Sequence, residues 1–129
     1  MLGTNDLKAR FSVGAFDIAS GVGILLGQLA RAEAGRSGRG PKALVICPPP
    51  ILATFGDFEF FAEMFSGGRE KSLRLRPCYE QMARETGATF LDAGNIITSS
   101  PYDGIHLDLE MQTKLGEAVA ASIAILEIP

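Results

Sequence analysis

The spacing of apolar residues predicts three helices. Between residues 17 and 34, apolar side chains recur three or four positions apart and would share one face of a helix. Three glycines inside this segment predict a close approach of the helix backbone to a sheet. The same periodicity predicts a helix over 70–86, kinked by Pro77, and a helix over 108–126 with Asp108 as its N-cap.

Two short apolar runs predict strands. KALVIC (42–47) is stopped by three prolines, and ATFLDAG (88–94) ends in glycine, which is typical of buried parallel strands. Strands that alternate with helices indicate one α/β domain over 1–129, with helices on both faces of a parallel sheet. A third strand is visible only as its end at Met1-Leu2. We therefore expect a fold that lacks its N-terminal strands.

Composition narrows the possible partners. With 47% hydrophobic and 21% charged residues, the chain is ordinary for a globular domain, and a net charge of −3 argues against a nucleic-acid partner. The two cysteines, Cys47 and Cys78, are predicted to be free thiols in a reducing compartment. No signal segment opens the chain, and no apolar run is long enough to span a bilayer. These features predict a cytoplasmic protein with no membrane partner.

The only histidine, His106, follows Asp103 by three positions. In a parallel α/β fold, the segment between a strand and the next helix lies at the carboxyl edge of the sheet, where sites form. A carboxylate at this spacing can reach the imidazole Nδ1 and leave Nε2 free as a general base. The alternative is an ordinary loop aspartate that makes a turn beside a histidine.

A second candidate is the segment GTND (3–6), directly after the stub of the third strand. An asparagine side chain at a strand end is a suitable N–H donor to a developing oxyanion, which would be the role of Asn5. Glycine, asparagine and aspartate also dominate polar turns for conformational reasons, so a plain turn is the alternative.

Taken together, these segments resemble the SGNH hydrolases, also called GDSL-type esterases and lipases. GTND and SPYDGIHLD (100–108) are similar to the third and fifth sequence blocks of that family, with VICPPPI, FAEMF and LDAG between them. The pattern is most similar to the bacterial arylesterase and acyl-hydrolase branch. The resemblance implies a three-layer, flavodoxin-like fold and a small-molecule ester substrate, with no cofactor and no metal.

The resemblance also implies a role for each residue. His106 would be the general base, Asp103 its orienting carboxylate and Asn5 an oxyanion donor, with Gly3 permitting a tight approach. The family's nucleophilic serine and a further oxyanion glycine belong to earlier blocks, and no Gly-Asp-Ser occurs in this chain. We therefore expect an N-terminally truncated member, holding about two-thirds of the domain. Ser100 is the first choice among possible substitute nucleophiles.

The expected function is serine-type hydrolysis of small acyl or aryl esters. The rivals are an inactive remnant of the fold or an assembly subunit, and a nucleotide-binding module, which the absence of a glycine-rich phosphate loop disfavours. Five phenylalanines lie within FGDFEFFAEMF (55–65). They could form core, a subunit interface or an acyl-binding wall. This cluster and the thin sheet predict a homo-oligomer.

Overall fold

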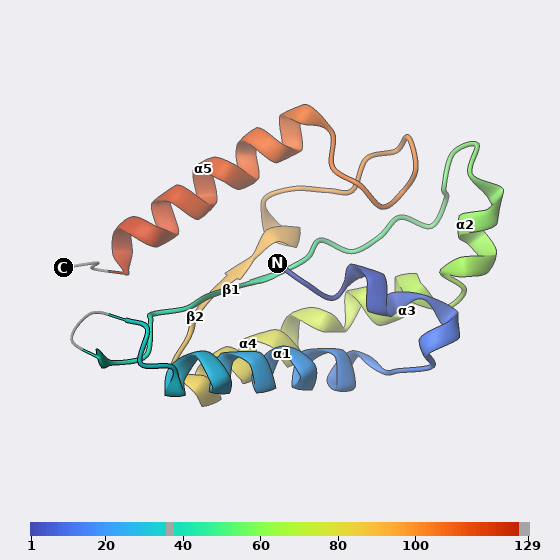
Figure 1. The fold of residues 1–129 in the computed structure, drawn as a ribbon. Coiled ribbons are helices and arrows are strands. Elements are labelled where there is room, and N and C mark those ends of the chain that lie inside the picture. Colours follow the sequence, from blue (N-terminus) through green and yellow to red (C-terminus); the bar gives the residue numbers. More distant parts are fainter. Residues whose placement is uncertain (36–37, 127–129) are drawn as a thin grey trace.

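A two-stranded parallel sheet forms the centre of the molecule. The computed structural model describes residues 1–35 and 38–126 (Figure 1). In it, β1 (Leu44–Cys47) pairs with β2 (Thr89–Asp92), and Leu44 lies opposite Thr89. This confirms the predicted α/β class and parallel sheet. Met1-Leu2 is not a strand in the described part of the chain, so the sheet has no third member there.

Helices cover both faces of the sheet. Figure 1 shows α1 (Ala15–Arg31) and α4 (Leu75–Thr86) together on one side, and α5 (Leu109–Ile125) on the other. The molecule therefore has three layers, as the family resemblance implies. Short helices connect them: η1 (Thr4–Leu7), η2 (Ala9–Phe11), α2 (Glu59–Met64), α3 (Gly68–Leu73) and η4 (Ala93–Asn95).

The prediction of one kinked helix over 70–86 is wrong. Two helices, α3 and α4, occupy this segment and meet at Arg74. Pro77 is the third residue of α4, where a backbone N–H has no intrahelical partner to lose. Proline is therefore accommodated without a kink. The prediction for α5 holds, since the Asp108 carboxylate accepts the amide of Met111 at 3.0 Å.

The core lies between α1, α4 and β1. Ile18, Val22 and Leu26 form the buried stripe of α1 and belong to the same cluster as Tyr79 and Met82 of α4. The close approach predicted for the α1 glycines occurs at Gly23, where an added Cβ would lie 2.8 Å from the Met82 sulfur. The neighbour is thus α4 rather than the sheet. Gly21, by contrast, faces open space.

One edge of the sheet is uncovered. β1 pairs only with β2 in the described chain, and the α1 residues beside its other edge, Leu25 and Leu29, are 45% and 43% exposed. An open groove of about 180 Å³ runs there between Met1-Leu2, α1 and β1. The apolar stripe of α1 is thus wider than a two-stranded sheet can bury.

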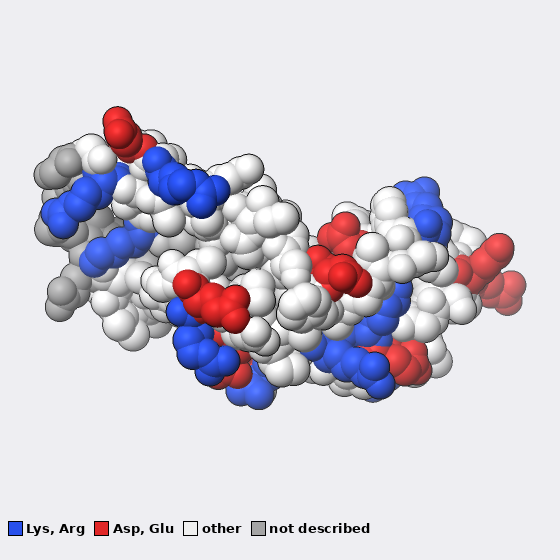
Figure 2. Space-filling view, turned by 90° about the horizontal axis from the view of Figure 1, so that it is seen from below, with Lys and Arg blue, Asp and Glu red and all other residues white. Residues whose placement is uncertain are grey.

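The remaining surface is mixed in charge. Figure 2, seen from below the view of Figure 1, shows acidic and basic side chains interspersed, so neither sign dominates that face. Arg76 of α4 pairs with Asp92 at the end of β2, with Nε and Oδ2 2.9 Å apart. Both cysteines are free thiols, as predicted. Among the residues described, no helix is both long and apolar enough to cross a membrane.

Candidate active site

The loop between η4 and α5 closes on itself around a glycine turn. The amide of Ser100 donates to the carbonyl of His106 at 2.7 Å, and the amide of Gly104 donates to the carbonyl of Ser100 at 2.8 Å. Gly104 has φ of +73°, and an added Cβ would lie 2.4 Å from the Thr54 carbonyl oxygen. Only glycine meets both conditions without strain. We call residues 99–107, which include Asp103 and His106, the dyad loop.

The dyad loop brings Asp103 and His106 together. Oδ2 of Asp103 lies 2.6 Å from Nδ1 of His106, while Oδ1 accepts the amides of Ile105 and His106, each at 2.9 Å. The aspartate side chain is only 12% exposed, whereas the imidazole is 73% exposed. The carboxylate is therefore fixed inside the loop, and the imidazole that it orients faces solvent.

These bonds keep Asp103 ionised. Burial alone would raise the pKa of Asp103, but hydrogen bonds from the Ile105 amide and from the imidazole and amide of His106 outweigh it and lower the pKa. An ionised carboxylate can only accept, so Nδ1 of His106 must carry the proton of their shared hydrogen bond. Nε2 then presents its lone pair to solvent, which is the state required of a general base.

The predicted oxyanion donor lies on η1. Asn5 is exposed, and its side chain makes no hydrogen bond within the described part of the chain, so its amide N–H groups are available. Gly3, just before η1, is buried and has φ of +110°. The group that approaches Gly3 closely is the hydroxyl of Tyr79, which donates to the carbonyl of Leu2 at 2.8 Å.

The segment that carries Asn5 and the dyad loop both lie at the carboxyl end of the sheet. In Figure 1, residues 3–7 and the dyad loop are both found beyond the carboxyl end of β1. No hydrogen bond joins Asn5 to His106 within residues 1–35 and 38–126. The structure thus brings His106 and Asp103 into contact and leaves Asn5, the predicted oxyanion donor, on a separate segment.

No serine of the described chain reaches the imidazole. Ser100 is buried, and its hydroxyl accepts the amide of Tyr102 at 3.3 Å. The hydroxyl of Ser99 donates to the carbonyl of Pro50. In the described part of the chain, His106 has Asp103 as its only side-chain hydrogen-bond partner. Within the described chain, the Asp103–His106 pair therefore has no nucleophile bonded to Nε2 of His106.

Aromatic rings line one side of the dyad loop. The rings of Phe58 and Tyr102 are 5.4 Å apart in an edge-to-face arrangement, and Phe58 stacks on Phe61 at 5.5 Å. Phe65, at the inner end of the cluster, is buried, whereas Phe60 is 57% exposed. The five phenylalanines thus divide between core and surface, and the surface part adjoins the candidate site.

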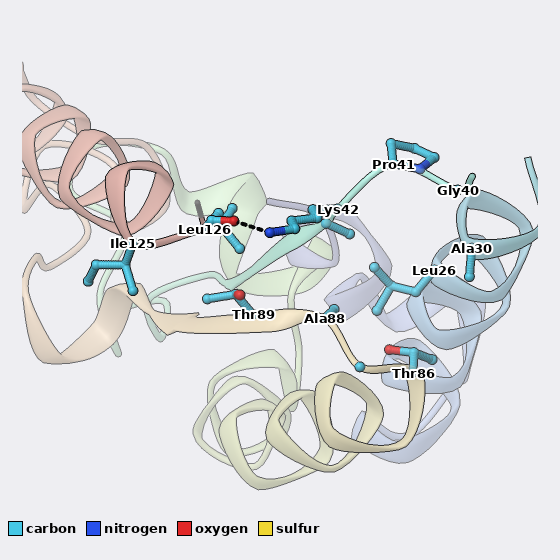
Figure 3. A pocket seen from close by; sticks show the side chains of 12 residues that line it. Leu26, Ala30, Gly40, Pro41, Lys42, Thr86, Ala88, Thr89, Ile125 and Leu126 are labelled. Carbon is cyan, nitrogen blue, oxygen red and sulfur yellow. Dashed lines mark hydrogen bonds between the residues drawn. The ribbon is translucent and has the colours of Figure 1, made fainter. Parts of the chain in front are cut away.

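A cavity of about 450 Å³ lies away from this chemistry. It is formed by residues that precede β1 and β2 and by the C-terminal ends of α1 and α5 (Figure 3). Lys42 crosses it to bond the carbonyl of Leu126. The cavity is therefore at the amino end of the strands. Within the residues described, no cluster of His, Cys, Asp or Glu could hold a metal ion.

Sequence patterns located the dyad but missed the residues that hold its loop. Asp103-Gly104 is a turn signal, and it could have predicted the tight loop. Arg69 and Ser72 of α3 bond the backbone of Ile51, whose neighbour Leu52 bonds the dyad loop. Nothing in the spacing of Arg69 and Ser72 marks them as supports of a site more than 30 residues away.

Comparisons with known proteins place these observations among esterases. No protein-family model and no curated protein matches the chain. Among solved structures, a carbohydrate acetylesterase from Sinorhizobium meliloti is 41% identical with a TM-score of 0.89, and an aryl esterase of M. smegmatis is 36% identical with the same TM-score. In both matches the similarity covers 98% of this chain and 59% of the other. The chain thus spans less than two-thirds of the length of the proteins it matches.

Proposed function

The chain belongs to the SGNH hydrolase family, and we propose that it carries the base, its carboxylate and one oxyanion donor of a serine-type esterase. The observation that carries the proposal is the 2.6 Å contact of His106 with a buried, ionised Asp103, which leaves Nε2 open to solvent. The substrate class is a small acyl or aryl ester, such as an acetylated carbohydrate.

In this mechanism a serine hydroxyl attacks the ester carbonyl while Nε2 of His106 takes its proton. Asp103 stabilises the imidazolium that forms, and the Asn5 side chain donates a hydrogen bond to the oxyanion. The imidazolium then protonates the leaving alcohol. Water, deprotonated in turn by His106, hydrolyses the acyl-enzyme.

The serine in this proposal comes from polypeptide outside these 129 residues. Two observations support that source: no described serine hydroxyl bonds to the imidazole, and the solved esterases are longer than the region this chain matches. The open edge of β1 is where further strands of such a sheet would pair. On its own the chain is then expected to be inactive, because a base without its nucleophile leaves little catalysis.

A chimera tests the base and its carboxylate. These 129 residues replace the matching part of the S. meliloti acetylesterase, and hydrolysis of 4-nitrophenyl acetate is measured. The chimera should turn over, and His106→Ala should lower kcat by about 10³-fold or more, as expected for loss of a triad base. The control Glu110→Gln, on the exposed side of α5, should have no effect. A folded chimera that is inactive, or that works equally well without His106, would overturn the proposal.

Fluorophosphonate labelling of the chain alone tests the source of the serine. We expect no labelled residue. Stoichiometric labelling that disappears in Ser100→Ala would instead identify Ser100 as a substitute nucleophile and contradict an external serine.

A further inference from the structure

The segment Pro50–Leu52 is held by α3 on one side. The buried amide of Ile51 donates to the hydroxyl of Ser72 at 3.3 Å, and the guanidinium of Arg69 donates to the Ile51 carbonyl at 2.7 Å. Ser72 is itself buried, and its hydroxyl donates to the carbonyl of Arg69 at 2.6 Å. Both backbone groups of Ile51 are therefore fixed by one turn of α3.

The same segment holds the dyad loop on its other side. The amide of Leu52 donates to the carbonyl of Gly104 at 2.8 Å, and the hydroxyl of Ser99 donates to the carbonyl of Pro50 at 3.1 Å. Gly104 directly follows Asp103 in the turn. A displacement of Ile51 would therefore pass to the dyad loop through two hydrogen bonds.

α3 also contacts the segment that carries Asn5. Gly68 begins α3, and a Cβ added there would lie 3.1 Å from Cδ1 of Ile51 and 3.3 Å from the carbonyl oxygen of Leu7, the last residue of η1. Contacts at these distances are tighter than ordinary van der Waals packing. One glycine thus permits α3 to pack against both η1 and the Pro50–Leu52 segment that bonds the dyad loop.

We propose that α3 is a positioning element that sets the separation between Asn5 and the Asp103–His106 pair. Gly68 fixes the distance to η1, while Arg69 and Ser72 fix the distance to the dyad loop through Ile51. An oxyanion donor acts only within hydrogen-bond distance of the reacting atom, and a misplacement of about 1 Å can cost about 10²-fold in rate. This inference rests on the proposed function, in which Asn5 and His106 serve one reaction.

The first test needs no turnover, because His106 is the only histidine and its ring protons give isolated NMR signals. Ser72→Ala removes the partner of the Ile51 amide. We expect the His106 ring signals to shift, and exchange of the Leu52 amide to accelerate at least tenfold relative to the amides of β2. The control Ser20→Ala removes a hydroxyl that donates to the carbonyl of Phe16 within α1 and has no other hydrogen bond among the described residues, and should do neither.

Two results would overturn the positioning role of Ser72. One is unchanged His106 signals in a folded Ser72→Ala variant. The other is an acceleration at Leu52 that merely equals the acceleration in β2, which would indicate global destabilisation. If Ser72→Ala does not fold, the half-buried Arg69 offers the same measurement through Arg69→Met, with exposed Arg84→Met as its control.

The second test uses the chimera. Gly68→Ala adds a methyl group at the contact with Leu7 and Ile51, and should lower kcat at least tenfold with a smaller change in KM. Gly116→Ala in α5, where nothing lies within 4 Å of the new methyl, should leave kcat unchanged. Equal kcat values for both variants would refute the role of Gly68. Failure of the esterase proposal would instead appear as activity that survives His106→Ala, so the two outcomes are distinct.

Discussion

Asp103→Asn isolates the role of the carboxylate because it keeps the shape of the side chain. The amide oxygen of asparagine can still accept the amides of Ile105 and His106, which now bond Oδ1 at 2.9 Å. The amide nitrogen then replaces Oδ2, 2.6 Å from Nδ1 of His106. Two N–H groups cannot face each other, so the imidazole must move its proton to Nε2 and accept at Nδ1.

The cost to stability should be small and the cost to catalysis large. A hydrogen bond to a charged group contributes about 1.5–3 kcal/mol, and the neutral bond that replaces it about 1 kcal/mol. Because the imidazole is largely exposed, the net loss should be about 1 kcal/mol or less. In a serine triad, however, the wrong tautomer lowers kcat by about 10⁴-fold, since Nε2 can no longer accept a proton.

The assay is ¹⁵N NMR of the single histidine at pH 9, high enough for an imidazole to be neutral. The parent chain should show a protonated Nδ1 and an unprotonated Nε2, and Asp103→Asn should reverse them. Asp108→Asn is the matched control, because asparagine caps a helix as well as aspartate does. The same tautomer in the parent and in Asp103→Asn would refute the orienting role.

The same pair of proteins gives a pH dependence. The pKa of Asp103 is lowered in the folded state, so the ionised form stabilises the fold above the unfolded value of about 3.9. That contribution is lost as pH falls through the lower folded pKa. Denaturant unfolding should therefore show the stability advantage over Asp103→Asn shrinking below about pH 4. A stability advantage over Asp103→Asn that grows as the pH falls would contradict a lowered pKa of Asp103.

Three further predictions concern packing, reactivity and assembly. Gly23→Ala should destabilise by about 1–2 kcal/mol in denaturant unfolding, because its methyl group would meet the Met82 sulfur, whereas Gly21→Ala should stabilise by up to about 1 kcal/mol. Burial, and then the charge of a nearby carboxylate, raise the pKa of Cys47 to about 12, so iodoacetamide at pH 8 should modify only the other cysteine in the folded chain, as checked by mass spectrometry. Light scattering should give a multiple of the chain mass, and Phe60→Asp should reduce it; a monomeric parent chain would contradict the expected homo-oligomer.

Elements with local signals could be predicted from the sequence. Asp108 and the apolar spacing after it lie within the helix that they define, and α5 has the expected bounds to within a residue. The break at Arg74 was missed because Pro77 is compatible both with a kink in one helix and with the first turn of a new one. Likewise, Gly23 meets α4 rather than the sheet, a choice that depends on residues about 60 positions away.

The same distinction applies to the candidate site. Asp103 and His106 are three residues apart in one turn, so their contact follows from local geometry and the Asp-Gly turn signal. The position of Asn5 relative to them depends on α3, which contacts Leu7 and Ile51 from a segment distant from both. Sequence spacing could therefore predict the contact between Asp103 and His106, but not the separation between that pair and Asn5.

The bonds that hold the Asp103–His106 pair lie away from the open edge of β1. The bonds that fix Asp103 come from the amides of Ile105 and His106 and from the His106 imidazole. The dyad loop is anchored by the amide of Leu52, which donates to the carbonyl of Gly104. None of these bonds involves the open edge of β1 or the exposed Leu25 and Leu29 beside it. Polypeptide that pairs with β1 would therefore bury apolar surface of α1 without having to build the Asp103–His106 contact, because residues 99–107 already orient the imidazole.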